Sequence, residues 1–179
     1  WLIGLAALAI PASAQTPAYL QPPLPVDQNS IPMITLLVDL TSGQVLHEHS
    51  GRYGFAPASM TKVMTALVVF DLIKAGKLSE DTVVTVRPET AARWAGKGTT
   101  LALRPNEQMR IGDLLLATTA ASANDAAVAL AEASAGSVES FAAMALQRTR
   151  QLGMQHSWFK NPNGYPDKGG TMTTAEDMA

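Results

Sequence analysis

The stretch Pro57-Ala58-Ser59-Met60-Thr61-Lys62 stands directly before a mostly apolar run, residues 63–73. The run contains neither Gly nor Pro, and Gly76 follows it, so the sequence predicts a helix over residues 60–73 that ends near this glycine. Apolar residues cover most of the circumference of this helix, which is typical of a helix buried inside a domain. The serine and the lysine of the stretch are therefore expected at the N-terminus of a core helix.

The three-residue spacing of Ser59 and Lys62 allows their side chains to meet, because residues three apart share one helix face. Burial and the positive end of the helix dipole both disfavour an ammonium ion, which lowers the pKa of Lys62 and lets its neutral amine accept a proton from the serine. The unpaired backbone N–H of Ser59 can face a developing oxyanion. The spacing by itself also fits a helix-capping serine beside a solvated lysine.

A second pair with the same spacing lies in Ser157-Trp158-Phe159-Lys160. The turn-forming sequence Asn161-Pro162-Asn163-Gly164 follows at once, so this segment is predicted to be extended and to run into a turn. Side chains three apart diverge in an extended chain, and this pair is not expected to form a site.

A polar triplet, Ser122-Ala123-Asn124, separates two segments that are predicted to be helical, residues 111–117 and 125–133. One interpretation is a loop that caps the second helix. The functional interpretation gives Ser122 the role of a proton relay near the lysine and Asn124 that of an amide that holds a substrate backbone.

Together the two motifs resemble those of the serine penicillin-recognising enzymes, whose set is S-x-x-K, then S-x-N, then K-[ST]-G. The closer likeness is to the low-molecular-mass penicillin-binding proteins, the D-alanyl-D-alanine carboxypeptidases, and it spans about Met33 to Ala179. The stretches that carry it are Phe55-Ala56-Pro57-Ala58-Ser59-Met60-Thr61-Lys62-Val63-Met64-Thr65-Ala66, Gly112-Asp113-Leu114-Leu115 with Ala121-Ser122-Ala123-Asn124-Asp125-Ala126-Ala127, and Asn161-Pro162-Asn163-Gly164 with Thr173-Thr174-Ala175-Glu176-Asp177-Met178-Ala179.

The resemblance implies an α/β fold, an antiparallel sheet flanked by a helical cluster, as in penicillin-binding proteins and β-lactamases. Residues 33–179 would be the N-terminal part of this catalytic domain, incomplete at its C-terminus. Ser59 would be the acylated nucleophile, Lys62 its base, Ser122 the relay to the leaving group and Asn124 a substrate-binding amide. The implied substrates are peptidoglycan stem peptides, with β-lactams as covalent inhibitors and with neither a metal nor an organic cofactor.

Two departures from the family pattern stand out. Ala123 occupies a position where many members have glycine, and no K-[ST]-G occurs in the chain: Lys97-Gly98-Thr99 has the wrong order and Lys168-Gly169-Gly170 lacks the hydroxyl residue. Residues 173–177 look like the start of a capped helix, close to the last residue. We therefore expect the sequence to be cut at its C-terminal end, ahead of a strand that carries the third motif.

The N-terminal residues indicate export. Residues 1–10 are apolar and Ala12-Ser13-Ala14 fits a cleavage site, so residues 1–14 are expected to be a signal peptide that lacks its basic n-region. Residues 15–32 are proline-rich and are predicted to be a linker without a fold of its own. The expected location is the periplasm or cell envelope, and the resemblance allows peripheral membrane association through a C-terminal segment beyond this sequence.

The amino-acid composition excludes some classes of protein and some partners. The chain has 179 residues, 47% of them hydrophobic, which suffices for one domain with a sizeable core. It has no cysteine and a net charge of −2, so a disulfide framework is excluded and nucleic acid is not an expected partner. His47-Glu48-His49 places two imidazoles on one strand face, but the absence of a third ligand in sequence favours an ordinary hairpin strand over a metal site.

The other elements are predicted from local pattern. Residues 33–39 and 44–49 form a hairpin, residues 82–86 a short strand, and residues 138–152 a helix that begins after Ser137 and ends at Gly153. Residues 87–104 are expected to be irregular.

The sequence leaves three alternatives to a carboxypeptidase. A D,D-endopeptidase of the same family would use the same residues to cut crosslinks. A class A β-lactamase needs a deacylating glutamate, and neither Glu132, Glu139 nor Glu176 lies in an E-x-x-L-N setting. A non-catalytic β-lactam- or peptidoglycan-binding module would keep the fold without turnover, which the intact Ser59, Lys62, Ser122 and Asn124 disfavour.

Overall fold

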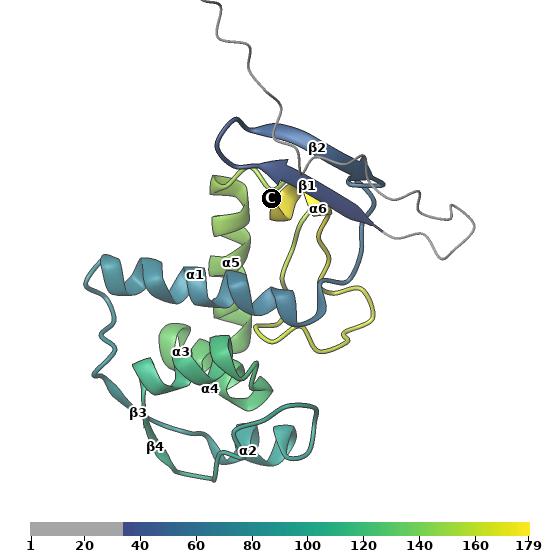
Figure 1. Ribbon diagram of the computed structural model, residues 1–179. Coiled ribbons are helices and arrows are strands. Elements are labelled where there is room, and N and C mark those ends of the chain that lie inside the picture. Colours follow the sequence, from purple (N-terminus) through teal and green to yellow (C-terminus); the bar gives the residue numbers. More distant parts are fainter. Residues whose placement is uncertain (1–33) are drawn as a thin grey trace, which may run out of the picture. The chain divides into compact units, whose positions relative to one another are not determined.

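The computed structural model describes residues 34–179, and its elements are drawn in Figure 1. The predicted signal peptide and linker, residues 1–32, lie outside the described residues. The elements in chain order are β1 Thr35–Asp39, β2 Gln44–His49, a 3₁₀ turn Ala58–Met60, α1 Thr61–Lys74, β3 Val83–Thr85, α2 Pro88–Trp94, β4 Gln108–Arg110, α3 Ile111–Ala120, α4 Asn124–Ala135, α5 Val138–Gln151 and α6 Ala175–Met178.

Strands β1 and β2 form the predicted antiparallel hairpin. The Asp39 carboxylate closes its turn, because it accepts hydrogen bonds from the Thr41 backbone N–H at 2.9 Å and from the Ser42 hydroxyl at 2.6 Å. Gly43 adopts φ +71° at the point where the chain enters β2, a conformation that favours glycine. A second two-stranded antiparallel sheet pairs β3 with β4.

Helix α1 lies at the centre of the helical cluster, as the apolar run predicted. It contacts α3, α4 and α5, and Val69 near its middle has no exposed surface. Small residues on α4, such as Ala126 and Ala131, are also fully buried and let neighbouring helices approach closely. The other large apolar residues of this core, with at most 2% of their surface exposed, are Val86, Ile111, Leu114, Leu130 and Phe141.

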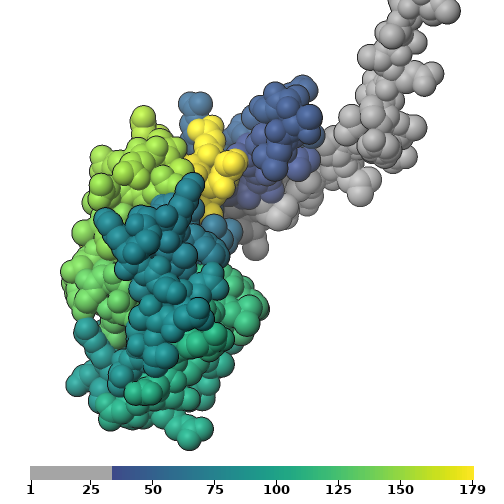
Figure 2. All heavy atoms as spheres, turned by 90° about the vertical axis from the view of Figure 1, so that its left-hand side faces the viewer, coloured from purple at the N-terminus to yellow at the C-terminus, as the bar shows by residue number. Residues whose placement is uncertain are grey.

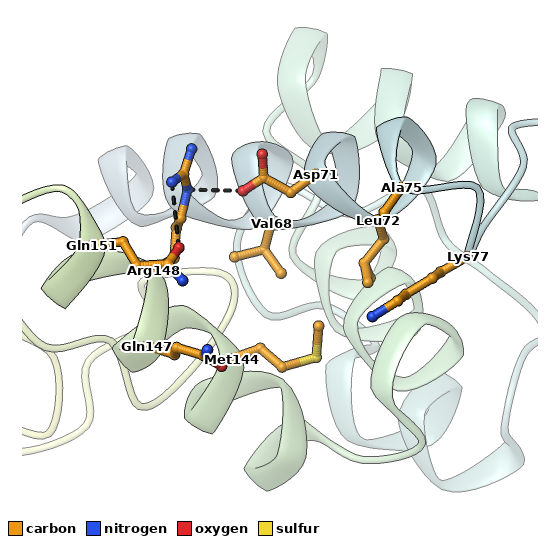
Figure 3. Close-up of a pocket in the computed structure, with 9 residues that line it drawn as sticks. All are labelled: Val68, Asp71, Leu72, Ala75, Lys77, Met144, Gln147, Arg148 and Gln151. Carbon is orange, nitrogen blue, oxygen red and sulfur yellow. Dashed lines mark hydrogen bonds and ion pairs between the residues drawn. The ribbon is translucent and has the colours of Figure 1, made fainter.

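A groove of about 240 Å³ runs between α1 and α5 (Figure 3). Its floor is apolar, with Val68 and Leu72 from α1 facing Met144 from α5. One end is bridged by an ion pair in which Arg148 Nε lies 2.8 Å from an Asp71 carboxylate oxygen. The pair ties α5 to α1 at a partly exposed position, where screening keeps its contribution to stability small.

The C-terminal segment returns to the hairpin and contacts it (Figure 2). Thr173 forms an antiparallel bridge with Phe55, and Arg52 makes an ion pair of 2.9 Å with Glu176. The Thr174 hydroxyl accepts a hydrogen bond from the Asp177 backbone N–H at 3.1 Å and caps α6. The predicted capped helix start in this region is confirmed.

Two predictions about local structure were wrong. Residues 87–104 were expected to be irregular, yet α2 occupies their first part, where Pro88 stands at the first turn and Glu89 favours the positive helix end. Asn124 was expected in a loop, but it is the first residue of α4. The glycines at 96 and 98 shaped the first prediction, although they follow the helix and do not interrupt it.

The helix predicted over residues 138–152 is confirmed as α5, with the Ser137 hydroxyl accepting from the Ser140 N–H at 3.0 Å. The segment at Ser157 is extended, as predicted, and Trp158 bridges to Met172. Among residues 34–179, no helix has both the length and the apolar character needed to span a bilayer.

Asp125, on the first turn of α4, binds the segment that precedes β4. Its buried carboxylate accepts backbone N–H bonds from Leu101 at 2.8 Å, Leu103 at 3.0 Å and Ala126 at 2.8 Å. These donors would lose their acceptor together if the carboxylate were removed. Asp125 therefore fixes the course of residues 101–103 against α4.

We expect Asp125→Ala to lower the free energy of unfolding of the full-length protein by about 2–4 kcal/mol, because buried N–H groups would be left unpaired. Asp125→Asn should cost less, since the amide oxygen can still accept. Asp113→Ala, which removes an exposed ion pair with Arg110, should cost less than about 1 kcal/mol. Urea denaturation measures the free energy of unfolding of all three variants. Equal losses for Asp125→Ala and Asp113→Ala would contradict the role of Asp125 in holding residues 101–103.

Candidate active site

Ser59 lies in the 3₁₀ turn that leads into α1, with its side chain exposed. Its backbone N–H has no backbone acceptor among residues 34–179, so it can serve as an oxyanion donor. The preceding residue, Ala58, has φ +48°. Such a conformation is costly for a residue other than glycine, by about 1–3 kcal/mol, and strain of this kind clusters at functional sites.

Lys62 has only 4% of its surface exposed, and its amine contacts three oxygen atoms. Lys62 Nζ lies 3.1 Å from Ser59 Oγ, 2.9 Å from Asn124 Oδ1 and 2.8 Å from the Asn163 carbonyl oxygen. Burial lowers the pKa of Lys62 from its ordinary value of 10.5 to about 8. The predicted meeting of Ser59 and Lys62 is thus present in the structure, together with the predicted direction of the pKa shift.

The positions of these oxygen atoms leave the lone pair of a neutral Lys62 amine directed at the Ser59 hydroxyl. A neutral amine has two N–H groups and one lone pair, and the side-chain oxygen of Asn124 and the backbone carbonyl oxygen of Asn163 can only accept hydrogen bonds. When both N–H groups are donated to them, the lone pair is left for the hydroxyl hydrogen of Ser59. The geometry suits Lys62 as a general base.

Asn124 connects the lysine to the segment before β4. Its Oδ1 accepts from Lys62, its Nδ2 donates to the Lys97 carbonyl at 2.8 Å, and its backbone N–H donates to the Thr99 carbonyl at 2.8 Å. A Cβ on Gly98 would come within 2.9 Å of Nδ2. The expected substrate-binding role of Asn124 stays a prediction; the structure gives it a positioning contact to Lys62.

Ser122 lies in the connection between α3 and α4, two residues before Asn124. It is half-buried and has φ +56°. A partly exposed hydroxyl at this position is compatible with a relay that engages substrate. The relay role of Ser122 also stays a prediction.

The second Ser-x-x-Lys pair is not a site. The Ser157 hydroxyl bonds to Asp177 Oδ2 at 2.6 Å and to the Thr173 hydroxyl at 2.7 Å, whereas Lys160 is exposed. The turn that follows it, residues 161–164, does reach the site, because Asn163 supplies an acceptor for Lys62 and the Thr65 hydroxyl donates to the Pro162 carbonyl at 2.7 Å.

Gly164 lets this turn pack closely against the backbone of Ala58, the residue before Ser59. It has φ +73°, and a Cβ built on it would lie 1.7 Å from the Ala58 carbonyl oxygen. Sequence reasoning recognised the turn but gave it no role. The signal was present in the unusual density of Asn, Pro and Gly at residues 161–164, although nothing local shows that the turn contacts Lys62.

The histidine pair of β2 takes part in the hairpin. His47 Nε2 lies 3.0 Å from the Thr35 hydroxyl across the strand pair. Within residues 34–179, no group of three His, Cys, Asp or Glu side chains is placed to hold a metal ion.

Comparison with known families identifies the chain. The family model of D-alanyl-D-alanine carboxypeptidases, peptidase family S11, matches residues 27–179. The chain belongs to this family. It is similar to the D-alanyl-D-alanine carboxypeptidase DacF of Bacillus subtilis, with 34% identity over 144 residues that cover 80% of this chain and 36% of that protein. The chain thus spans little more than a third of the length of this relative.

Solved structures of family members share the fold. The D-alanyl-D-alanine carboxypeptidase DacD of Francisella tularensis superposes with a TM-score of 0.78 and 32% identity, covering 93% of this chain and 38% of that one. Penicillin-binding protein 5 of Haemophilus influenzae gives a TM-score of 0.77 and 32% identity, covering 84% of this chain and 44% of that one. The predicted fold class, the penicillin-binding protein fold, is confirmed.

Replacing Lys62 by Arg, which does not deprotonate, should slow acylation of Ser59 by at least about a hundredfold. In the unsubstituted protein the acylation rate should rise with pH through about 8, because only the neutral amine accepts the proton. Stopped-flow measurements with a fluorescent penicillin over pH 6–10 would show both effects. The matched control is Lys160→Ala, which should acylate normally; a comparable loss in that variant would contradict the assignment of the base.

Proposed function

We propose that the protein containing this chain is an exported serine D-alanyl-D-alanine carboxypeptidase that removes the terminal D-alanine of peptidoglycan stem peptides. The observation that carries the proposal is the buried amine of Lys62, which lies 3.1 Å from Ser59 Oγ and is held by two acceptors. Its family membership supports the substrate class, since the relatives above are named for this activity.

The first half of the reaction forms an ester. Ser59 Oγ attacks the carbonyl carbon of the penultimate D-alanine while its proton passes to the neutral amine of Lys62. The carbonyl oxygen becomes an oxyanion, which the Ser59 backbone N–H stabilises. The proton then reaches the nitrogen of the terminal D-alanine through the Ser122 hydroxyl, the C–N bond breaks, and D-alanine leaves.

The second half hydrolyses that ester. A water molecule attacks the acyl carbon and gives up a proton to Lys62, which is neutral again after the first half. The ester bond breaks, the proton returns to Ser59 Oγ, and the shortened peptide is released with a new carboxylate. In this proposal Asn124 has two tasks, since it holds Lys62 and offers its amide to the substrate backbone.

β-Lactams should acylate the same serine. Their ring amide presents a carbonyl carbon to Ser59 as the peptide does, and one of the relatives above is named a penicillin-binding protein. The periplasm or cell envelope is the proposed location, because peptidoglycan lies there and residues 1–14 have the pattern of a signal peptide. The proposal includes peripheral membrane association of the whole protein.

A D,D-endopeptidase would use the same residues on a crosslinked substrate. The named relatives favour terminal cleavage, and the products separate the two activities. A carboxypeptidase releases free D-alanine from a pentapeptide, whereas an endopeptidase converts crosslinked dimers into monomers. Purified protein incubated with each substrate and analysed by mass spectrometry distinguishes them.

We expect a fluorescent penicillin to label the full-length protein at Ser59 and the protein to release D-alanine from a stem pentapeptide. Ser59→Ala should abolish both, because the variant lacks the hydroxyl that lies against the Lys62 amine and forms the ester. The control Ser157→Ala removes the serine of the second Ser-x-x-Lys pair and should still be labelled. Undiminished labelling of Ser59→Ala would place the nucleophile elsewhere, and labelling without D-alanine release would favour a non-catalytic binding module.

A further inference from the structure

The turn at residues 161–164 is fixed at three points to α1 and to the 3₁₀ turn that precedes it. Two are hydrogen bonds, from Lys62 Nζ to the Asn163 carbonyl at 2.8 Å and from the Thr65 hydroxyl to the Pro162 carbonyl at 2.7 Å. The third is the close contact between Gly164 and the Ala58 carbonyl. Any shift of this turn would move an acceptor away from Lys62 and disturb the residue that precedes Ser59.

Asn161 holds the turn in shape. Its Oδ1 accepts hydrogen bonds from the Gly164 backbone N–H at 2.6 Å and from the Asn163 backbone N–H at 3.3 Å. Both partners are donors, so only the oxygen of the Asn161 amide can face them. The NH₂ group must then face the opposite side, where Asp167 lies.

Asp167 accepts hydrogen bonds at each of its contacts. Asn161 Nδ2 donates to its Oδ2 at 2.6 Å, the Thr171 hydroxyl donates to the same oxygen at 2.7 Å, and the Thr171 backbone N–H donates to Oδ1 at 3.0 Å. A flipped Asn161 amide would set its oxygen against this carboxylate. The charge of Asp167 therefore favours the orientation of Asn161 that the turn requires, and the Tyr165 carbonyl, which accepts from Asn161 Nδ2 at 3.1 Å, favours the same orientation.

We propose that Asp167 is a positioning residue for Lys62, because its carboxylate orients the Asn161 amide that holds the turn and, through the Asn163 carbonyl, the catalytic amine. This inference rests on the proposed function, in which Lys62 is the base for Ser59. The charged groups around the turn are Lys160, which directly precedes it, and Arg93 and Lys168, which line the same cavity as Asn161 and Asp167. Lys97 and Tyr165 lie beside the Trp94 ring. The lowered pKa of Lys62 comes from burial and from none of these charges.

Asp167→Asn tests the proposal because it keeps the shape of the side chain and removes its charge. Its single oxygen can face Asn161 only if its NH₂ group meets the donating backbone N–H of Thr171. The acylation rate with a fluorescent penicillin should fall by about tenfold or more. The rise of this rate with pH should also move to higher pH, because a loosened turn admits water to Lys62 and returns its pKa from about 8 toward 10.5.

The matched control is Lys168→Gln in the same loop, an exposed residue whose substitution should change neither the rate nor its pH dependence. If Asp167→Asn does not fold, Thr171→Val removes one donor of the same network and should shift both quantities in the same direction by a smaller amount. Melting temperatures of all variants show how much of any loss is due to stability alone.

The proposal is overturned if Asp167→Asn acylates at the normal rate, or if its rate falls while its pH dependence stays in place, which would show a purely structural role. Titration of ¹³C-labelled Lys62 by NMR gives a readout that needs no activity. A protein that is not acylated at all, yet shows the expected rise in the pKa of Lys62 in Asp167→Asn, would contradict the proposed function and support the positioning role.

Discussion

The site depends on keeping one amine out of water. Lys62 projects from the first turn of a helix whose far side is packed into the core, and the hydroxyl, the amide oxygen and the backbone carbonyl around it come from three separate parts of the chain. None of these acceptors carries a charge, so burial can lower the pKa of the lysine without a carboxylate restoring the ammonium form. The apolar packing of α1 therefore serves chemistry as well as stability.

The two carboxylates described near the site, Asp125 and Asp167, bond to other groups and not to the Lys62 amine. Asp125 binds the backbone that passes beside Asn124, and Asp167 binds the amide that shapes the turn at residues 161–164. Placed in direct contact with Lys62, either one would stabilise the ammonium form by ion pairing. At their observed positions they hold neutral groups in place, and the neutral amide and carbonyl oxygens accept hydrogen bonds from the Lys62 amine.

Sequence reasoning succeeded where the determining interactions are local. Ser59 and Lys62 share a helix face because of their spacing, and Ser137 caps α5 within a few residues. It failed to assign the turn at residues 161–164, since the contact of Asn163 with Lys62 joins residues 101 positions apart. It also missed α2. Gly96 and Gly98 led to the prediction of irregular structure for residues 87–104, although Pro88 and Glu89 are typical of the first turn of a helix. Asn124 was predicted as a substrate-binding residue, a role that stays a prediction, and its bond to Lys62 could not be derived from its position between two helices.

Gly164 offers a way to recognise this kind of site in other sequences. A Ser-x-x-Lys pair arises often by chance. The close contact between the turn and the Ala58 carbonyl is more restrictive, because it requires glycine at residue 164, far from the pair in sequence. A search that requires both features would discard pairs such as the one at residues 157–160, which look the same in isolation. In this chain a side chain at residue 164 would collide with the carbonyl of the residue before Ser59, which residues 157–160 do not require of any distant glycine.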